Sequence, residues 1–430
     1  MNRKKLLGTS GLLILFVVSF CQDDPKNIDS ERIFNGPYKD EFLTRVAFPV
    51  GGIGAGMVCL EGTGAFSHVS VYNKPDIFNE PNIFAAISIK GLENGAKVLE
   101  GPVPDFKIFG RPNTGRGAPR TNYGLPRFDH AEFEVHFPFG KVRLTDDDIP
   151  LDVCITGWSP FIPTDPDHSS LPCGAFEYTF VNNGNTEVEA LFSYNTVNFM
   201  AQPGCNPSVK PHLNGFILSN RPPEEAPQLA GDFAIYTNDH NTLVDHCWFR
   251  GTWYDPLSIT WKHIEKAEPR VVGPKAGDAP GASLYVPFQL KPGEEKRVRL
   301  MISWYVPNST LRMAGVHAHA VDEYDPGTEC CESPYHQPWY STRFGSIQEV
   351  ADYWRVHYDD LKQRTNAFTE AFYHTTLPDA VTEAVAANLT ILKSPTVLRQ
   401  PDGKLWSWEG CNDNSGCCAG SCTHVWNYAQ

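Results

Sequence analysis

The chain is short of positive charge. Its 430 residues carry 36 Lys and Arg against 50 Asp and Glu, which gives a formal net charge of -14. Surplus negative charge repels the phosphates of nucleic acids and of anionic lipids. We therefore predict that nucleic acid is not a partner, and a neutral substrate fits the charge balance better.

A regular cysteine framework is also missing. A domain of this size does not need disulfides to fold, so scattered cysteines are expected to act mostly as small buried hydrophobic residues. This expectation concerns Cys59, Cys154, Cys173, Cys205, Cys247, Cys330 and Cys331.

The glycine-rich stretch Pro49–Gly56 lacks the parts of a nucleotide site. No Lys followed by Ser or Thr completes a phosphate-binding loop, and the residues after it do not lead into a dinucleotide-binding unit. We interpret these glycines as a place where strands cross closely or bulge. No cofactor is predicted.

Metal-binding patterns are incomplete. Asp413 and His424 lie near four cysteines, but only one pair has the spacing of half a zinc site. A local disulfide, free thiols in a tight loop and a zinc ion all stay open for Cys411, Cys417, Cys418 and Cys422. The pair His317 and His319 has no third ligand at a fixed spacing, so we predict no metal site there.

The N-terminus has the pattern of an export signal. Three basic residues at positions 3–5 precede the apolar run Leu12–Val18, which is too short to span a bilayer. Val18–Cys21 resembles a bacterial lipobox, although Phe20 stands where a small residue is usual. Residues 1–21 are therefore predicted to be a signal peptide, with Cys21 as the lipidated residue.

Two acidic residues directly follow Cys21. Asp23 and Asp24 resemble the export signal of surface lipoproteins in some bacteria. We expect an outer-membrane or cell-surface lipoprotein with a lipid anchor, and periplasmic secretion is the alternative. No other stretch is apolar enough to cross a membrane.

Residues 22–310 have the pattern of an antiparallel β-sandwich. Ala131–Phe137 alternates apolar and polar residues, which predicts a half-buried strand. Phe176–Val181 and Val188–Tyr194 flank an Asn-Gly step and predict a hairpin. A second pair of segments repeats this scheme around a Lys-Pro-Gly-Glu turn, namely Leu284–Leu290 and Val298–Trp304.

Helical patterns begin after Pro307. Ser346 and Glu349 form a capping box, and apolar residues at helical spacing follow as far as Phe372. We assign residues 311–375 to a linker and a long helix. A second helix is predicted from Thr376 to Ser394, so residues 376–430 would begin another domain.

The segment Trp406–Tyr428 is the part of the chain densest in reactive side chains. Its Glu409 lies between Trp408 and Gly410, a setting in which a partly desolvated carboxylate can act as nucleophile or base. Taken alone, a single Glu is more often an exposed structural residue. We expect the chain to be broken off inside its active-site domain.

A set of ordered motifs resembles glycoside hydrolase family 116, the family of non-lysosomal glucosylceramidase and bacterial β-glucosidases. The motifs are Phe48–Gly56, Ile302–Tyr305, Tyr340–Gly345, Asn388–Pro395, Trp408–Gly410 and Thr423–Tyr428. The resemblance implies an N-terminal β-sandwich followed by an α/α six-hairpin toroid, of which this chain would hold only the first helices.

The resemblance also implies roles for residues near the C-terminus. Glu409 matches the catalytic nucleophile of a retaining β-glycosidase, and Trp408 and Trp426 would contact the sugar. His424 stands where the family has a sugar-binding Asp, which affects sugar specificity. The family's acid/base Asp would lie past Gln430, so this fragment alone is expected to be inactive on β-glucosides or β-xylosides.

Two other functions are kept as alternatives. A non-catalytic surface lipoprotein that binds carbohydrate through the sandwich is the first. A structural module that the cysteine cluster holds together through a metal is the second. For both the surface lipoprotein and the enzyme, the predicted partner is a carbohydrate or glycoside.

Overall fold

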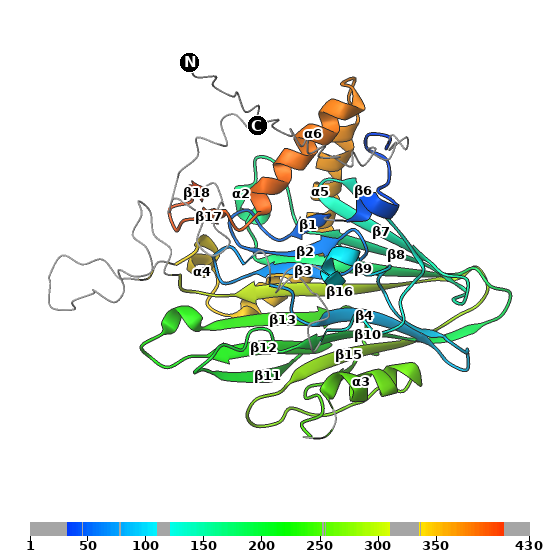
Figure 1. Cartoon of the computed structure of the whole chain (residues 1–430). Helices are drawn as coiled ribbons and strands as arrows, with labels where there is room; N and C mark the ends of the chain where they lie inside the picture. The colour runs from blue at the N-terminus through cyan, green and yellow to red at the C-terminus, as the bar shows by residue number, and fades with distance from the viewer. Residues whose placement is uncertain are drawn as a thin grey trace, which may run out of the picture.

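The computed structural model describes residues 32–44, 46–76, 79–109, 121–251, 253, 255–309, 335 and 337–407. This part of the chain is built mainly from antiparallel sheets (Figure 1). The largest sheet has eight strands, in the order β11 (Asn206–His212), β12 (Gly215–Arg221), β13 (Gly231–Thr237), β16 (Glu295–Tyr305), β9 (Cys173–Asn182), β8 (Leu151–Trp158), β7 (Phe139–Thr145) and β6 (His130–His136).

Three smaller sheets contain the other strands of the described residues. A five-stranded sheet has the order β14 (Leu243–Asp245), β15 (Gly281–Leu290), β10 (Val188–Val197), β4 (Ile83–Ile89) and β5 (Ala96–Val98). A three-stranded sheet consists of β1 (Ala47–Val50), β2 (Met57–Glu61) and β3 (Phe66–Ser70). The last pair is β17 (Val397–Arg399) and β18 (Leu405–Ser407).

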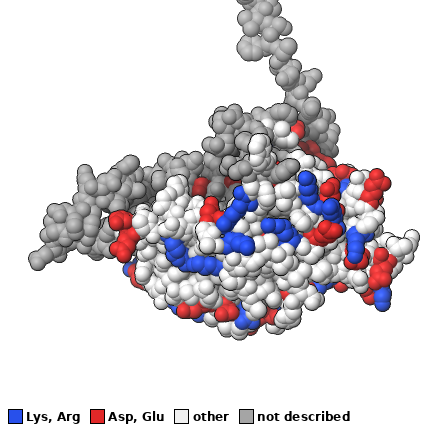
Figure 2. Space-filling model, turned by 90° about the horizontal axis from the view of Figure 1, so that it is seen from below, with Lys and Arg blue, Asp and Glu red and all other residues white. Residues whose placement is uncertain are grey.

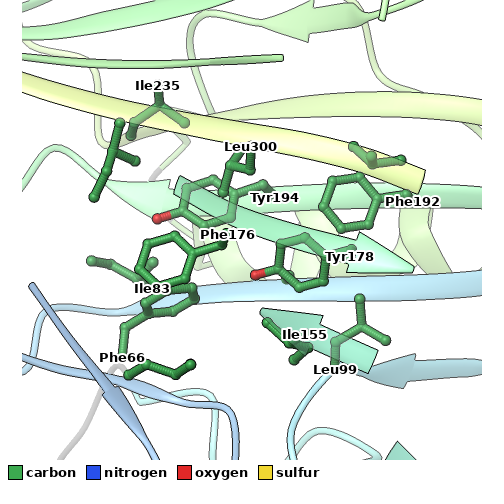
Figure 3. Packing of buried hydrophobic residues seen from close by; sticks show 14 of the residues in the cluster. Phe66, Ile83, Leu99, Ile155, Phe176, Tyr178, Phe192, Tyr194, Ile235 and Leu300 are labelled. Atoms are coloured by element: carbon green, nitrogen blue, oxygen red, sulfur yellow. The ribbon is translucent and has the colours of Figure 1, made fainter. Parts of the chain in front are cut away.

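The main core lies between the sheets and is rich in aromatic rings (Figure 3). Tyr178 of β9 and Phe192 of β10 have ring centroids 4.8 Å apart, so the eight- and five-stranded sheets meet face to face. Phe66 of β3 packs edge-on against Phe176 of β9 at 4.8 Å. Fully buried aromatic side chains of this kind supply much of the hydrophobic stabilisation. The prediction of β-rich antiparallel sheets is confirmed.

The two predicted hairpins are wrong, although their strands exist. β9 pairs with β8 and β16, whereas its successor β10 pairs with β4 and β15 in the other sheet. β15 and β16 are divided between the two sheets in the same way. Each connection is therefore an arch that crosses from one sheet to the other.

Asn182 explains why the first turn forms an arch. It is buried at the end of β9, where its side-chain amide donates to the carbonyls of Thr186 (2.8 Å) and Leu290 (2.9 Å). Its backbone N–H donates to Glu294 O at 3.0 Å, so the two arches are tied to each other. Neither Asn183 nor Gly184 has a positive φ, which the tight hairpin turn would need.

The strand predicted at Ala131–Phe137 is present as β6. Phe133 is buried and Val135 is partly buried on its inner face, as the alternation predicts, and Phe137 is fully buried just after the strand. β6 forms the edge of the eight-stranded sheet and pairs only with β7 among the named strands.

Helices cover the outer faces of the sandwich. The described ones are η1 (Asp40–Leu43), α1 (Asp105–Phe109), α2 (Pro166–Ser169), η2 (Pro227–Leu229), α3 (Pro256–Glu265), α4 (Trp339–Arg343), α5 (Ile347–Tyr373), α6 (Asp379–Leu389) and η4 (Thr390–Lys393). Trp261 and Ile264 of α3 pack on Phe84 and Tyr285 of the five-stranded sheet. Seen from below, Lys and Arg side chains lie across the middle of the molecule, with Asp and Glu mainly toward its edges (Figure 2).

Helix α5 is joined tightly to the eight-stranded sheet. Trp354 donates from Nε1 to Gly174 O at 3.0 Å. Tyr358 donates to Glu177 Oε1 at 2.6 Å and accepts from Trp158 Nε1 at 3.1 Å. Because these three contacts are buried, α5 closes a second core on the outer face of the sheet.

The predicted capping box starts α5. Ser346 is the N-cap, and its hydroxyl accepts from the N–H of Glu349 at 3.3 Å. Glu349 in turn accepts from the N–H of Gly345 at 2.8 Å, one residue earlier than the standard box. The long helix predicted from this signal is confirmed.

Replacing Ser346 with Ala is expected to lower the free energy of unfolding by about 1 kcal/mol, because the Glu349 N–H loses its acceptor. Urea unfolding measures the change. Ser341→Ala in α4 is a matched control at a residue that does not cap α5. A Ser346→Ala variant as stable as the wild type would show that the cap contributes nothing.

Helix α6 lies over the sandwich, and the apolar side chains near its N-terminal end are exposed. Val381 and Val385 are 42% and 43% exposed, and Leu377 before the helix is 56% exposed. The buried positions of the helix are Thr382 and Ala386 instead. The helix was predicted correctly, and Leu389 at its end packs against the main core, while the stripe formed by residues 377, 381 and 385 stays exposed within the described residues.

Three of the scattered cysteines, Cys59, Cys173 and Cys247, are buried free thiols, as expected. Within the described ranges, no helix is both long and apolar enough to cross a bilayer. The last strand of the sandwich ends at Tyr305 and α4 begins at Trp339, while the domain limits at residues 310 and 375 stay predictions.

Candidate functional site

The described chain reaches Ser407, two positions before Glu409. The predicted site residues Trp408, Glu409, His424 and Trp426 lie outside the described residues. So do the predicted lipidation residue Cys21, the four-cysteine cluster at 411–422 and the pair His317 and His319. The geometry that can be described is therefore that of the frame from which the predicted nucleophile extends.

Strands β17 and β18 form a hairpin that leads directly to Trp408. Val397 lies opposite Ser407, and Arg399 lies opposite Leu405. The turn between them closes through Gln400, whose N–H donates to Lys404 O at 2.8 Å, and Gly403 has a φ of +86° that favours glycine.

The hairpin lies against the glycine-rich stretch between β1 and β2. The Arg399 N–H donates to Gly54 O at 3.2 Å. A Cβ on Gly54 would lie 2.3 Å from that same nitrogen, and one on Gly52 would lie 2.3 Å from Leu171 O. These glycines permit close backbone contact, which confirms their interpretation as a crossing rather than a phosphate loop.

Lys393 connects the end of η4 to the same stretch. Its fully buried ammonium donates to Ser159 O (3.0 Å), Ser159 Oγ (2.5 Å) and Pro160 O (3.3 Å). Ser159 Oγ also donates to Gly51 O at 2.7 Å and accepts from Gly51 N at 3.0 Å. One lysine thus fixes the segment before the hairpin to β8 and to the first glycine.

Burial lowers the pKa of Lys393 to about 7, because the interior disfavours its charged form. The rings of Phe137 and Phe161, both 5.8 Å from Nζ, form its apolar surroundings. This ammonium therefore changes protonation near neutral pH, which is unusual for a lysine.

Arg399 holds the hairpin from the other side. Its guanidinium lies 4.0 Å from the ring centroid of Trp339, and the side chain is 8% exposed. It donates to Asp167 Oδ1 at 2.7 Å and to Pro166 O at 3.1 Å. Stacking and paired hydrogen bonds make use of the planar guanidinium, which Lys could not replace.

Helix α2 joins this frame to α5 through a chain of polar contacts. His168 Nδ1 donates to Asp165 Oδ2 at 2.6 Å, and its Nε2 accepts from the Tyr353 hydroxyl at 2.8 Å. Burial acts to raise the pKa of Asp165, but hydrogen bonds from Arg364 and His168 outweigh it and lower the pKa to about 2. Asp165 therefore stays ionised at neutral pH.

The frame is a set of positioning contacts, not a reaction centre. Its cations Lys393, Arg399 and Arg364 are directed at carbonyls or carboxylates of the protein itself. In the described part of the chain, no three His, Cys, Asp or Glu side chains are grouped to hold a metal ion.

Sequence reasoning missed both Lys393 and Arg399. Lys393 ends an apolar helix just before Ser394 and Pro395, where an exposed lysine is the usual expectation. Arg399 follows two apolar residues and precedes a polar one at the end of a short strand, where an exposed arginine is the usual expectation. Only their tertiary partners, more than 200 positions away, show that they are buried.

Comparison with known proteins gives one family match. Residues 47–361 match the profile described as beta-glucosidase 2, glycosyl-hydrolase family 116 N-term. No curated protein matches the chain.

Similar solved structures include a protein described as a kojibiose phosphorylase from the human microbiome, at 7% identity and a TM-score of 0.37. Another is a family GH92 α-mannosidase from Bacteroides thetaiotaomicron, at 8% identity and a TM-score of 0.32. The matches cover 83% and 85% of this chain but only 35% and 42% of those proteins, so the chain spans less than half of their length.

Proposed function

The chain belongs to glycosyl-hydrolase family 116 through the N-terminal domain of that family, and we propose that it carries the nucleophile of a retaining β-glycosidase. The proposed nucleophile is Glu409. Its proposed substrates are β-glucosides, with β-xylosides as the second choice. The neutral sugar agrees with the net charge of -14.

The observation that supports this role is the fixing of the segment before Glu409. Lys393 and Arg399 attach this segment to β8, the glycine-rich stretch and α2, with both side chains buried. A nucleophile works only when its carboxylate is held within about 0.5 Å of the productive geometry. Two buried anchors, one before the hairpin and one in its first strand, are the type of rigid support that this precision requires.

Retaining hydrolysis uses two carboxyl groups about 5 Å apart. Glu409 would attack the anomeric carbon and form a glycosyl-enzyme intermediate, while an acid/base residue protonates the leaving oxygen. We propose that this second group comes from later helices, which would pack on the uncovered apolar stripe of α6. Leu377, Val381 and Val385 form that stripe.

Trp408, Trp426 and His424 would then surround the sugar. Aromatic faces pack on the C–H faces of sugar rings, and His424 would donate to a hydroxyl. Cys21 would anchor the protein to the outer membrane through its lipid, which places the enzyme where extracellular glycosides arrive. Secretion into the periplasm stays the alternative.

The test uses the leaving group to separate the two carboxyl roles. Alkyl β-glucosides need protonation by the acid/base residue, whereas a 2,4-dinitrophenolate leaves without a proton. We expect the chain to leave methyl β-glucoside uncleaved. With 2,4-dinitrophenyl 2-deoxy-2-fluoro-β-glucoside we expect covalent labelling, which peptide mass spectrometry places on Glu409. Glu409→Gln is expected to take up no label.

Glu383→Gln is the matched control, because Glu383 lies on α6 and binds Arg32 rather than the hairpin. This variant should label like the wild type. Labelling at another residue, or none at all, would contradict the role of Glu409. Steady turnover of methyl β-glucoside by this chain would show that the acid/base group lies within it.

A further inference from the structure

A small polar cavity opens at the N-terminal end of β3, within the sandwich. We name it the Lys107 cavity. Its volume is about 50 Å³, and one wall is apolar, formed by Phe66, Pro81 and Ile83. The polar side chains around it are Glu80, Asn82, Glu100, Lys107, Asn122 and Tyr123. None of them takes part in the frame around the β17–β18 hairpin.

The donors on one side of the cavity are already engaged. Lys107 is buried on α1 and donates to Glu61 Oε1 at 2.5 Å and to Glu80 Oε2 at 3.0 Å. The Tyr123 hydroxyl donates to the same Glu80 oxygen at 3.4 Å. These contacts hold Glu80, which is 18% exposed, in a fixed orientation beside the cavity.

Two acceptors of the lining residues have no donor among the described residues. Glu100 is 4% exposed and accepts from Arg127 Nε at 3.3 Å through one oxygen, while its other oxygen has no partner among the described residues. The Asn82 side-chain oxygen also lacks a partner there. Buried acceptors without a donor are costly, so a group that brings O–H donors stabilises them.

Charge selects the class of ligand. The carboxyl groups of Glu61, Glu80 and Glu100 outnumber the two cations beside them, Lys107 and Arg127, so no cation is left over to attract an anion. Burial raises the pKa of Glu61 and of Glu100, which reduces the negative charge in the cavity. Both cations are already paired with these carboxyl groups, so little net negative potential remains to attract an amine. No metal-holding group of three side chains occurs in the described ranges. A neutral ligand that has a hydrogen-bond donor and an apolar face fits the cavity best.

We propose that the Lys107 cavity binds the hydroxymethyl end of a neutral hexoside, as a saccharide subsite. About 50 Å³ holds a few water-sized groups, so the end of a sugar enters and the ring stays at the mouth. The hydroxyl donates to the free acceptors, and the C–H groups contact the apolar wall.

The cavity and the glycine-rich stretch lie at opposite ends of the same strand. Phe66 begins β3 at the cavity, whereas Ser70 ends it next to Gly56, where a Cβ would lie 2.6 Å from Ser70 O. Five residues of strand span about 15 Å. The cavity therefore lies about 15 Å from that end of the strand, and the proposal does not depend on the proposed function.

Isothermal titration of the full chain with methyl β-glucoside tests the subsite. We expect a Kd of about 1 mM for a ligand of this size. Methyl β-xyloside lacks the hydroxymethyl group and is expected to bind about tenfold more weakly. Ala65→Leu fills the cavity and should abolish binding, while the exposed Ala201→Leu should leave it unchanged.

Tyr123→Phe is the second variant, because it removes one contact to Glu80 without filling space, and it should weaken binding severalfold. Glu409→Gln should bind like the wild type. Binding that Glu409→Gln removes and Ala65→Leu retains would belong to the catalytic centre, which overturns the subsite and supports the proposed function. Tighter binding of methylammonium or inorganic phosphate than of the glucoside, or no saturable binding, would also overturn it.

Discussion

Gly54→Ala is expected to lower the free energy of unfolding by about 3 to 5 kcal/mol and to loosen the β17–β18 hairpin. Gly54 has a φ of +67°, where an L-residue is strained. Its new Cβ would lie 2.3 Å from Arg399 N and 2.9 Å from Leu398 C. Because both atoms belong to the backbone, the hairpin itself must move.

Two measurements distinguish backbone strain at the substituted glycine from displacement of the β17–β18 hairpin. Gly293 has a φ of +79°, but a Cβ added there would meet no atom within 4 Å, so Gly293→Ala should cost only about 1 kcal/mol. Hydrogen exchange should show faster exchange of the Arg399 amide in Gly54→Ala and not in Gly293→Ala. Equal costs for the two variants would contradict the close contact between Gly54 and the hairpin.

The glycine-rich stretch could be interpreted from sequence because the alternatives need specific partners. A phosphate loop requires a Lys and a hydroxyl residue that this stretch does not have. What the sequence could not indicate is the element that the glycines approach. Arg399 lies 345 positions after Gly54, and only the fold brings them together.

Strand positions were predictable, but strand pairing was not. Alternation and β-branched residues locate β9 and β10, yet the same pattern suits a hairpin and an arch. The choice depends on whether the apolar faces lie side by side or opposite each other. Tyr178 and Phe192 face each other across the core, and Asn182 supplies the buried amide contacts that the arch needs.

Helix starts were predictable because capping is local. Ser346 and Glu349 lie three positions apart and act on neighbouring N–H groups, so the start of α5 needs no tertiary information. Burial of a helix face does need it. The apolar stripe of α6 has normal helical spacing, but whether another element covers Val381 and Val385 is not encoded in that spacing.

Lys393 shows that the burial of a side chain cannot be predicted from its charge alone. A lysine is almost never fully buried unless it is paired with other groups, and here the partners are carbonyls and a hydroxyl rather than a carboxylate. The cost of desolvation is reflected in its pKa of about 7, well below the ordinary 10.5. This difference makes the stability of the fold depend on pH.

The sign of this dependence follows from proton uptake. Between pH 7 and 10.5 the unfolded lysine binds a proton that the folded one has lost, so the free energy of unfolding rises with pH in this window. The slope for one proton is about 1.4 kcal/mol per pH unit. From pH 7 to pH 9 this group is therefore expected to add about 2 to 3 kcal/mol, and below pH 7 its contribution stays constant.

Lys393→Met keeps the length of the side chain and removes the titration. Its free energy of unfolding, measured by urea at pH 7, 8 and 9, should lack the rise that the wild type shows. Lys362→Met is the matched control, because Lys362 is partly exposed and binds the carboxylate of Glu177. A wild type whose stability relative to Lys393→Met is the same at all three pH values would show that Lys393 stays charged when buried, held by Ser159 and Pro160.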